Sequence, residues 1–151
     1  MDPALGAVLG VCMRWIHIVS VVTLIGGYIY ARFVFAPALA SAAPAGQNSL
    51  ASAAQSAFRP ILFTVVTAVL ISGIYNYATK PSFPPGYHMW MGIKLLLVLH
   101  ILSSAILDST RAPNPAKARR TQLGIVITGL LAIAIANYLR YLSLTALSTR
   151  P

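Results

Sequence analysis

Five ionisable side chains lie within or beside long apolar stretches of the sequence, where ionisable groups are rare. They are Arg14, His17, His88, Lys94 and His100. An ionisable group at the centre of a membrane-spanning helix costs about 2.5–3.5 kcal/mol on insertion scales, so each one is a candidate for function. The two acids of the chain, Asp2 and Asp108, are expected outside these stretches. Lys94 therefore needs an external anion or backbone carbonyls to satisfy its charge.

Sulfur-containing side chains gather near two of the histidines. Cys12 and Met13 precede His17, and Met89 and Met91 follow His88. Thiolate, thioether and imidazole groups suit Cu(I), so Cys12, Met13, His17, His88 and Met91 form a candidate copper site, with Met89 beside it. The alternative needs no metal, because methionine is a common gap-filler in cores and a lone cysteine behaves as a small hydrophobe.

A b-type haem is the second cofactor that these residue types suit. Histidine paired with a second histidine or a methionine from another helix can hold a haem iron. His17 is then one axial ligand, and His88, Met91 or His100 is the other. Lys94 or Arg14 would face the propionates. His100 follows His88 by 12 residues, a rise of about 18 Å along a helix, so the two histidines cannot share one mononuclear site.

The composition indicates that membrane-spanning helices position these residues. Of the 151 residues, 58% are hydrophobic and 9% are charged, whereas a soluble domain carries about 25% charged residues. A spanning helix needs about 20 mostly apolar residues, and four stretches qualify: 13–35, 61–77, 89–107 and 123–142. We predict an all-α fold in which residues 1–151 form a single integral-membrane four-helix transmembrane bundle in a lipid bilayer. The second stretch is the shortest.

The basic residues predict how the bundle is oriented. The net charge is +9, but the basic residues form no continuous stripe, so we expect no nucleic-acid partner. One side of the membrane receives Arg32, Arg59, Arg111, Lys117, Arg119 and Arg120; the other receives Arg14, Lys80, Arg140 and Arg150. By the positive-inside rule, the protein is expected in the inner (cytoplasmic) membrane as a multi-pass protein with both termini outside the cytoplasm.

Short motifs in three of the four stretches resemble those of a known family. They are His17 followed by Gly26-Gly27-x-x-Tyr30 and Pro37-x-Leu39, then Ser72-Gly73-Ile74-Tyr75, and then Trp90-x-x-x-Lys94-Leu-Leu-Leu. The chain resembles the copper-resistance protein D family and the related four-span membrane protoporphyrinogen oxidase family. This resemblance implies that His17 is the haem or metal histidine and that Lys94 is the family's third-span lysine. Ser72 stands where the family usually has threonine, and His100 follows Lys94 at a shorter spacing than the histidine of the oxidases.

Three classes of function fit these observations. The first is a b-type haem protein for electron transfer, or a subunit of a redox or respiratory membrane complex. The second is a copper transport or resistance protein, and the third is a non-catalytic structural subunit that binds other membrane subunits. The unpaired Lys94 favours haem, because an ammonium attracts propionates and repels copper ions. An enzymatic role would be that of a haem-linked oxidoreductase, such as the oxidase that the resemblance implies.

Overall fold

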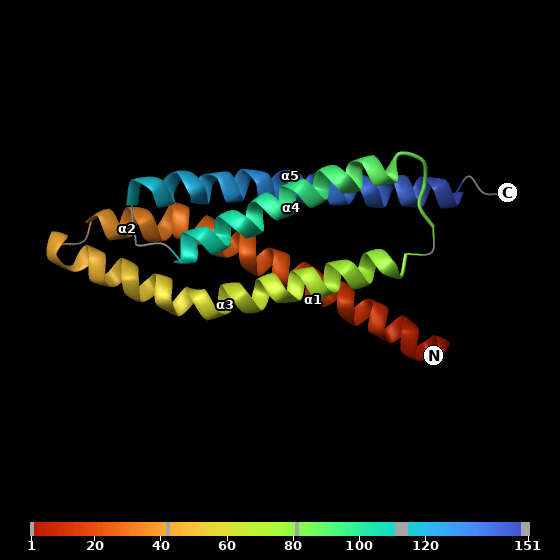
Figure 1. Ribbon diagram of the computed structural model, residues 1–151, viewed down its shortest axis with the longest axis horizontal. Helices are drawn as coiled ribbons and strands as arrows, with labels where there is room; N and C mark the ends of the chain where they lie inside the picture. Colours follow the sequence, from red (N-terminus) through yellow and green to blue (C-terminus); the bar gives the residue numbers. More distant parts are fainter. Residues whose placement is uncertain (1, 42, 81, 111–114, 149–151) are drawn as a thin grey trace.

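The computed structural model describes residues 2–41, 43–80, 82–110 and 115–148 of the chain. In chain order the elements are α1 (Pro3–Tyr30), the π-helix η1 (Ala31–Phe35), α2 (Ala36–Ser41), α3 (Pro44–Ala78), α4 (Tyr87–Thr110) and α5 (Pro115–Ser148). Figure 1 shows the long helices running in alternating directions, roughly along the horizontal axis of the picture. Within the described residues, four helical segments are long and apolar enough to cross a membrane. The predicted all-α four-helix membrane bundle is confirmed.

The helices extend well beyond the predicted stretches. The second stretch, predicted to be the shortest, belongs to α3, which at 35 residues is the longest single helix. Its additional turns are rich in alanine and serine. Alanine favours helix and serine tolerates it, but these residues are less hydrophobic than the leucine, isoleucine and valine of the predicted stretch. Helix α4 likewise continues to Thr110. Asp108 therefore lies inside a spanning helix, and the prediction that it lies outside is wrong. Asp2, by contrast, caps α1, where its carboxylate accepts a hydrogen bond from the backbone N–H of Ala4 at 3.0 Å.

A π-helical turn interrupts the first span just before Pro37. The backbone N–H of Ala36 donates to the carbonyl of Ala31, five residues earlier, in place of the α-helical partner four residues earlier. Proline has no N–H to donate, and its ring clashes with the carbonyl four residues before it. The wider π turn relieves this clash, so the helix continues through η1 into α2 without a break.

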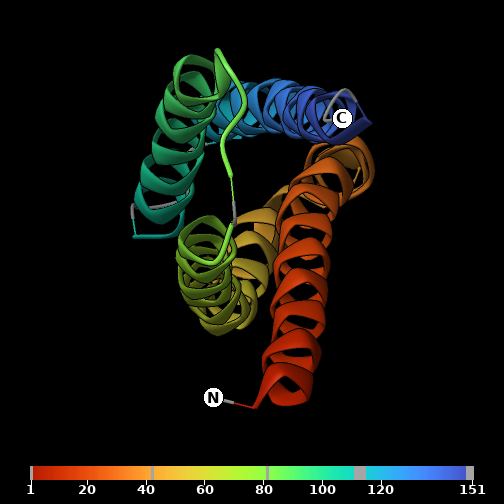
Figure 2. The same cartoon turned by 90° about the vertical axis from the view of Figure 1, so that its right-hand side faces the viewer.

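The four long helices form a ring in which neighbours along the chain are neighbours in space. Helix α1 packs against α3 and α5, and α4 packs against α5 and α3. Figure 2 views this ring from the end where α1 begins and α5 ends, here called the termini end. The opposite end, which holds η1 and α2, is called the distal end. Helices α1 and α4 therefore face each other across the ring and do not lie side by side.

The buried core lies toward the distal half of the bundle. Tyr28, Leu62, Ala105 and Ile125 are buried there, and the hydroxyl of Tyr28 donates to the carbonyl of Ala105 at 3.4 Å across the ring. At the termini end α1 diverges from the other helices (Figure 1), and Ser20 is the first buried residue among those whose burial is described in α1. Large apolar side chains on the outside of the ring fit contact with lipid.

Candidate functional site

His17 of α1 is held by the facing surface of α3. Its Nδ1 lies 3.0 Å from the Oγ of Ser72. The Ser72 hydroxyl donates its own proton to the carbonyls of Ala68 and Val69 on the same helix. Because that proton is already used, the Ser72 oxygen accepts the contact, and we assign the donated hydrogen to Nδ1 of His17. This tautomer leaves the lone pair on Nε2, the ring atom that can bind iron or take up a proton.

A glycine gives the His17 ring the space it occupies. A Cβ atom on Gly73 would lie 3.3 Å from Cε1 of His17, closer than side chains normally approach. The Ser72-Gly73 pair thus performs two tasks, with Ser72 orienting the ring and Gly73 making room for it. The Ser72 contact involves Nδ1, so it leaves Nε2 to a ligand.

Lys94 of α4 is the charged residue that the fold brings to His17. Lys94 is half-buried, and its positive charge acts on the His17 ring from across the bundle. Within the described part of the chain, its ammonium has neither a hydrogen bond nor an ion pair. Asp108, the acid on the same helix, is 14 residues away, a rise of about 21 Å. The expectation that no acid lies in a spanning helix is thus wrong, because Asp108 shares the span of Lys94.

The predicted opposite ligands differ in their environments. Met91 is half-buried and precedes Lys94 by three residues, so the two side chains share a helix face. His88 and His100 are both exposed, and the ring of His88 stacks against Phe83 at 5.0 Å between centroids. Of His88, Met91 and His100, Met91 is therefore the candidate that shares a face of α4 with Lys94.

The sulfur-containing side chains of the predicted copper site differ in their surroundings. Cys12 and Met89 are exposed, and Met13 contributes its backbone carbonyl, which accepts a hydrogen bond from the side chain of Asn76 at 3.3 Å. In residues 2–41, 43–80, 82–110 and 115–148, no group of three or more histidine, cysteine, aspartate or glutamate residues could hold a metal ion.

Arg14 is exposed in the part of α1 toward the termini end. The ammonium of Lys80 donates to the hydroxyl of Ser143 at 2.7 Å and lies 4.1 Å above the ring of Tyr87. Burial lowers the pKa of Lys80 below its ordinary value, and the charge of Arg14 lowers this pKa further. These contacts tie the connection between α3 and α4 to the end of α5, which is a structural role.

A hollow that no sequence motif predicted lies at the distal end. It has a volume of about 990 Å³ and is lined by residues of α1, η1, α2, α3, α4 and α5. None of the candidate ligands named above lines it. The sequence signal that could have found it is Pro37, because a proline within a helix disturbs the preceding turn. Arg32 lies in that turn.

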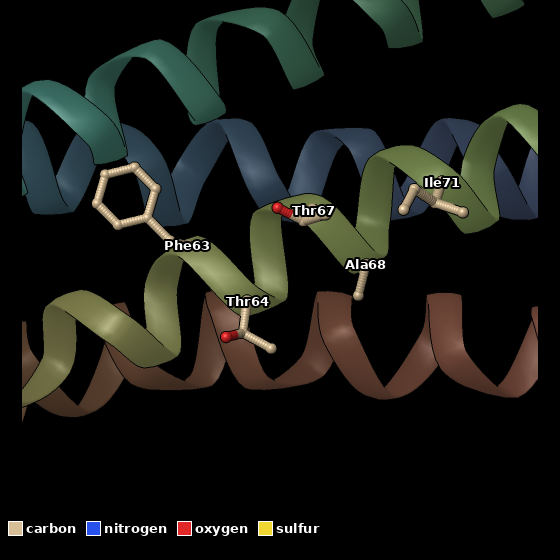
Figure 3. A pocket seen from close by; sticks show the side chains of 5 residues that line it. All are labelled: Phe63, Thr64, Thr67, Ala68 and Ile71. Atoms are coloured by element: carbon tan, nitrogen blue, oxygen red, sulfur yellow. The ribbon is translucent and has the colours of Figure 1, made fainter.

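A second hollow lies on α3 alone. It has a volume of about 500 Å³ and is lined by Phe63, Thr64, Thr67, Ala68 and Ile71. Figure 3 shows these five side chains spread along one stretch of α3. Thr64 already donates its hydroxyl to the carbonyl of Pro60 at 3.0 Å. With no charged group in its lining, this hollow suits a lipid chain better than a reactive site.

Comparison of the chain with models of known protein families, with curated proteins and with solved structures finds no match. The resemblance of its motifs to the copper-resistance protein D family is therefore carried by the quoted residues alone.

Proposed function

We propose that this protein is a membrane-embedded b-type haem protein that transfers electrons or serves as a subunit of a redox or respiratory complex. The observation that carries this proposal is the His17 arrangement, in which Ser72 fixes the Nδ1–H tautomer and Nε2 is left to a ligand. Metal-binding histidines are generally held in this way, with the second ring nitrogen donating to a fixed acceptor.

The donor set fits a haem better than a bare metal ion. His17 would hold the iron from α1, and Met91 would be the opposite ligand from α4, since histidine and methionine together are a known haem pair. Lys94 is a partly buried cation without a protein carboxylate, and it would bind a propionate. The same cation disfavours copper at His17, because like charges repel most strongly where water is scarce.

When bound, the haem would supply a one-electron redox centre inside the bilayer. The protein's own contribution is to orient the His17 ring through Ser72, to leave space for it beside Gly73, and to place a positive charge nearby through Lys94. Apolar helices around the site would limit access of water. His100, which is exposed on the outside of the ring, is left out of this site.

The proposal is tested by an absorption spectrum of the detergent-purified protein, recorded together with metal analysis. We expect a Soret band and iron in a fixed ratio to protein. Copper without a Soret band would support the copper alternative instead. Protein that carries neither cofactor and is isolated only with partner chains would support the structural-subunit alternative.

Ser72→Ala tests how the His17 ring is oriented. Removing the hydroxyl takes away the acceptor for Nδ1–H while leaving His17 itself in place. Loss of such a supporting group typically lowers metal affinity by about 10–100-fold, and we expect haem affinity to fall in this range. The measurement is haem titration followed at the Soret band. Ser72→Thr keeps the hydroxyl and is the matched control, which should stay close to the parent protein; equal affinities in all three proteins would contradict the role assigned to Ser72.

The orientation proposed for the bundle places the termini end outside the cytoplasm. Among the described basic residues, Arg32, Arg59, Lys117, Arg119 and Arg120 lie at the distal end, and Arg14, Lys80 and Arg140 lie toward the termini end. Arg111 and Arg150, which also entered the prediction, lie outside the described residues. The excess at the distal end favours a cytoplasmic location for it.

Single cysteines test this orientation, because Cys12 is the chain's one cysteine and can be replaced by alanine. In that background, Ser82→Cys should react in intact cells with a maleimide that cannot cross the membrane. Ala43→Cys, at the distal end, should react only after the cells are opened. The reverse pattern would overturn the proposed orientation.

A further inference from the structure

The distal-end cavity has the size and lining of a ligand site that is separate from His17. Its volume of about 990 Å³ lies at the upper end of the range of about 300–1,000 Å³ that is common for ligand pockets. A bare inorganic anion would fill only a small part of it. The cavity therefore suits a larger molecule that contacts several helices at once.

Positive charge predominates around this cavity. Arg32 from η1 and Lys117 and Arg119 from α5 line it, against one carboxylate, Asp108 from α4. Arg32 is half-buried, and its Nε is a buried donor with no hydrogen-bond partner among the described residues. A buried donor is normally paired, so a ligand acceptor at this position would complete its bonding.

The π-helical turn presents Arg32 to the cavity. Ala31, Arg32 and Phe35, three of the five residues of η1, belong to the lining. Single π turns within α-helices occur frequently at functional sites. Here the guanidinium also lies near the ring of Phe33, at 5.3 Å from its centroid. The Arg32 guanidinium thus owes its position to the π turn η1, which forms because Pro37 follows it.

Much of the remaining wall is apolar and identifies the kind of occupant. Phe35, Leu39, Phe58, Ile61 and Leu107 contribute to it. A ligand for this cavity needs an anionic head and an apolar body. The cavity lies toward the distal ends of the candidate spanning helices, where headgroups would lie in a bilayer. Basic pockets between such helices bind anionic headgroups.

We propose that the distal-end cavity binds one anionic phospholipid, with its phosphate at Arg32 and the beginning of its acyl chains along the apolar wall. A lipid phosphate and free inorganic phosphate offer the same acceptor oxygens to Arg32, and competition with inorganic phosphate distinguishes the two. Binding here is independent of haem at His17, because no His17-site residue lines the cavity.

Native mass spectrometry of the full chain, released from detergent containing phosphatidylglycerol or phosphatidylcholine, measures the retained lipid directly. We expect one phosphatidylglycerol to be retained in preference to phosphatidylcholine, and Arg32→Gln to weaken its retention by at least about tenfold, as loss of a charge-assisted hydrogen bond would. Arg59→Gln is the matched control. Arg59 is exposed, stacks on Phe63 and does not line the cavity, so this variant should retain lipid like the parent.

Equal retention of the two lipids, or equal losses in both arginine variants, would overturn the proposal in favour of general surface electrostatics. Displacement of phosphatidylglycerol by millimolar inorganic phosphate in an Arg32-dependent manner would assign the site to free phosphate and overturn the lipid. A second pair of variants covers the case in which Arg32→Gln does not fold. Ala54 lines the cavity and Ala53 does not, so Ala54→Leu should exclude the lipid and Ala53→Leu should not; retention in Ala54→Leu would contradict the site.

Discussion

His17→Ala is expected to abolish the Soret band of the purified protein while leaving the helical bundle folded. His17 is only half-buried, and its side chain hydrogen-bonds to α3, at Ser72 and at the backbone of Val69. Truncation therefore removes the ligand atom at small cost to packing. The iron would lose one of its ligands. We therefore expect haem content to fall by more than the roughly 10–100-fold that loss of a supporting group causes.

His100→Ala is the matched control for this experiment. It removes the same side chain from another spanning helix, but from an exposed position. Haem content and helical circular dichroism should both match those of the parent protein. A Soret band that survives His17→Ala unchanged would refute the assignment of His17 as a ligand, and a band lost only in His100→Ala would move the site to the outside of α4.

Gly129→Leu is expected to destabilise the bundle by forcing α1 and α5 apart. A Cβ atom at Gly129 would overlap the Cδ1 of Ile25 and lie 3.1 Å from its Cγ1, so α1 and α5 approach closely only because this position has no side chain. Overpacking of a filled core costs about 1–3 kcal/mol, and Ile25 is itself buried. Thermal unfolding in detergent, followed by circular dichroism, measures the effect.

Gly124→Leu provides the control on the same helix. No atom lies within 4 Å of a Cβ built at Gly124, and leucine is a better helix former than glycine by roughly 1 kcal/mol. This variant should therefore be as stable as the parent protein or slightly more stable. Equal losses in the two variants would show that the glycines matter for the backbone alone and not for the α1–α5 contact.

The number of helices and their apolar character could be predicted because they depend on composition alone. The residues 61–77 were enough to indicate a second span, but the start of α3 at Pro44 was missed because alanine and serine carry weak hydropathy. The same limit applies to Asp108, which one extra turn of α4 brings inside a helix. Helix ends in such segments depend on packing and on the bilayer, which local sequence does not describe.

The candidate site could be predicted in part. The placement of His17 and Lys94 within spanning helices followed from their positions in apolar stretches. The motif Ser72-Gly73-Ile74-Tyr75 is visible in the sequence, but the orienting role of Ser72 depends on its hydrogen bond to His17. The order of the helices around the ring, which sets α1 opposite α4, depends on how four apolar surfaces pack together, and so does the cavity at Arg32. Neither is encoded in any single segment.

The pairing of the helices has a consequence for how the protein is assembled. Packing is closest within two helical hairpins, α1 with α3 and α4 with α5, whose partners follow each other along the chain and can associate as soon as both are inserted. The contact of Ile25 with Gly129 joins segments that are 104 residues apart, so it closes only after the last helix has been made. Ser72 orients His17 within the first hairpin, and Lys94 belongs to the second. Each hairpin thus carries half of the proposed site, and the two halves meet only when the hairpins pack together.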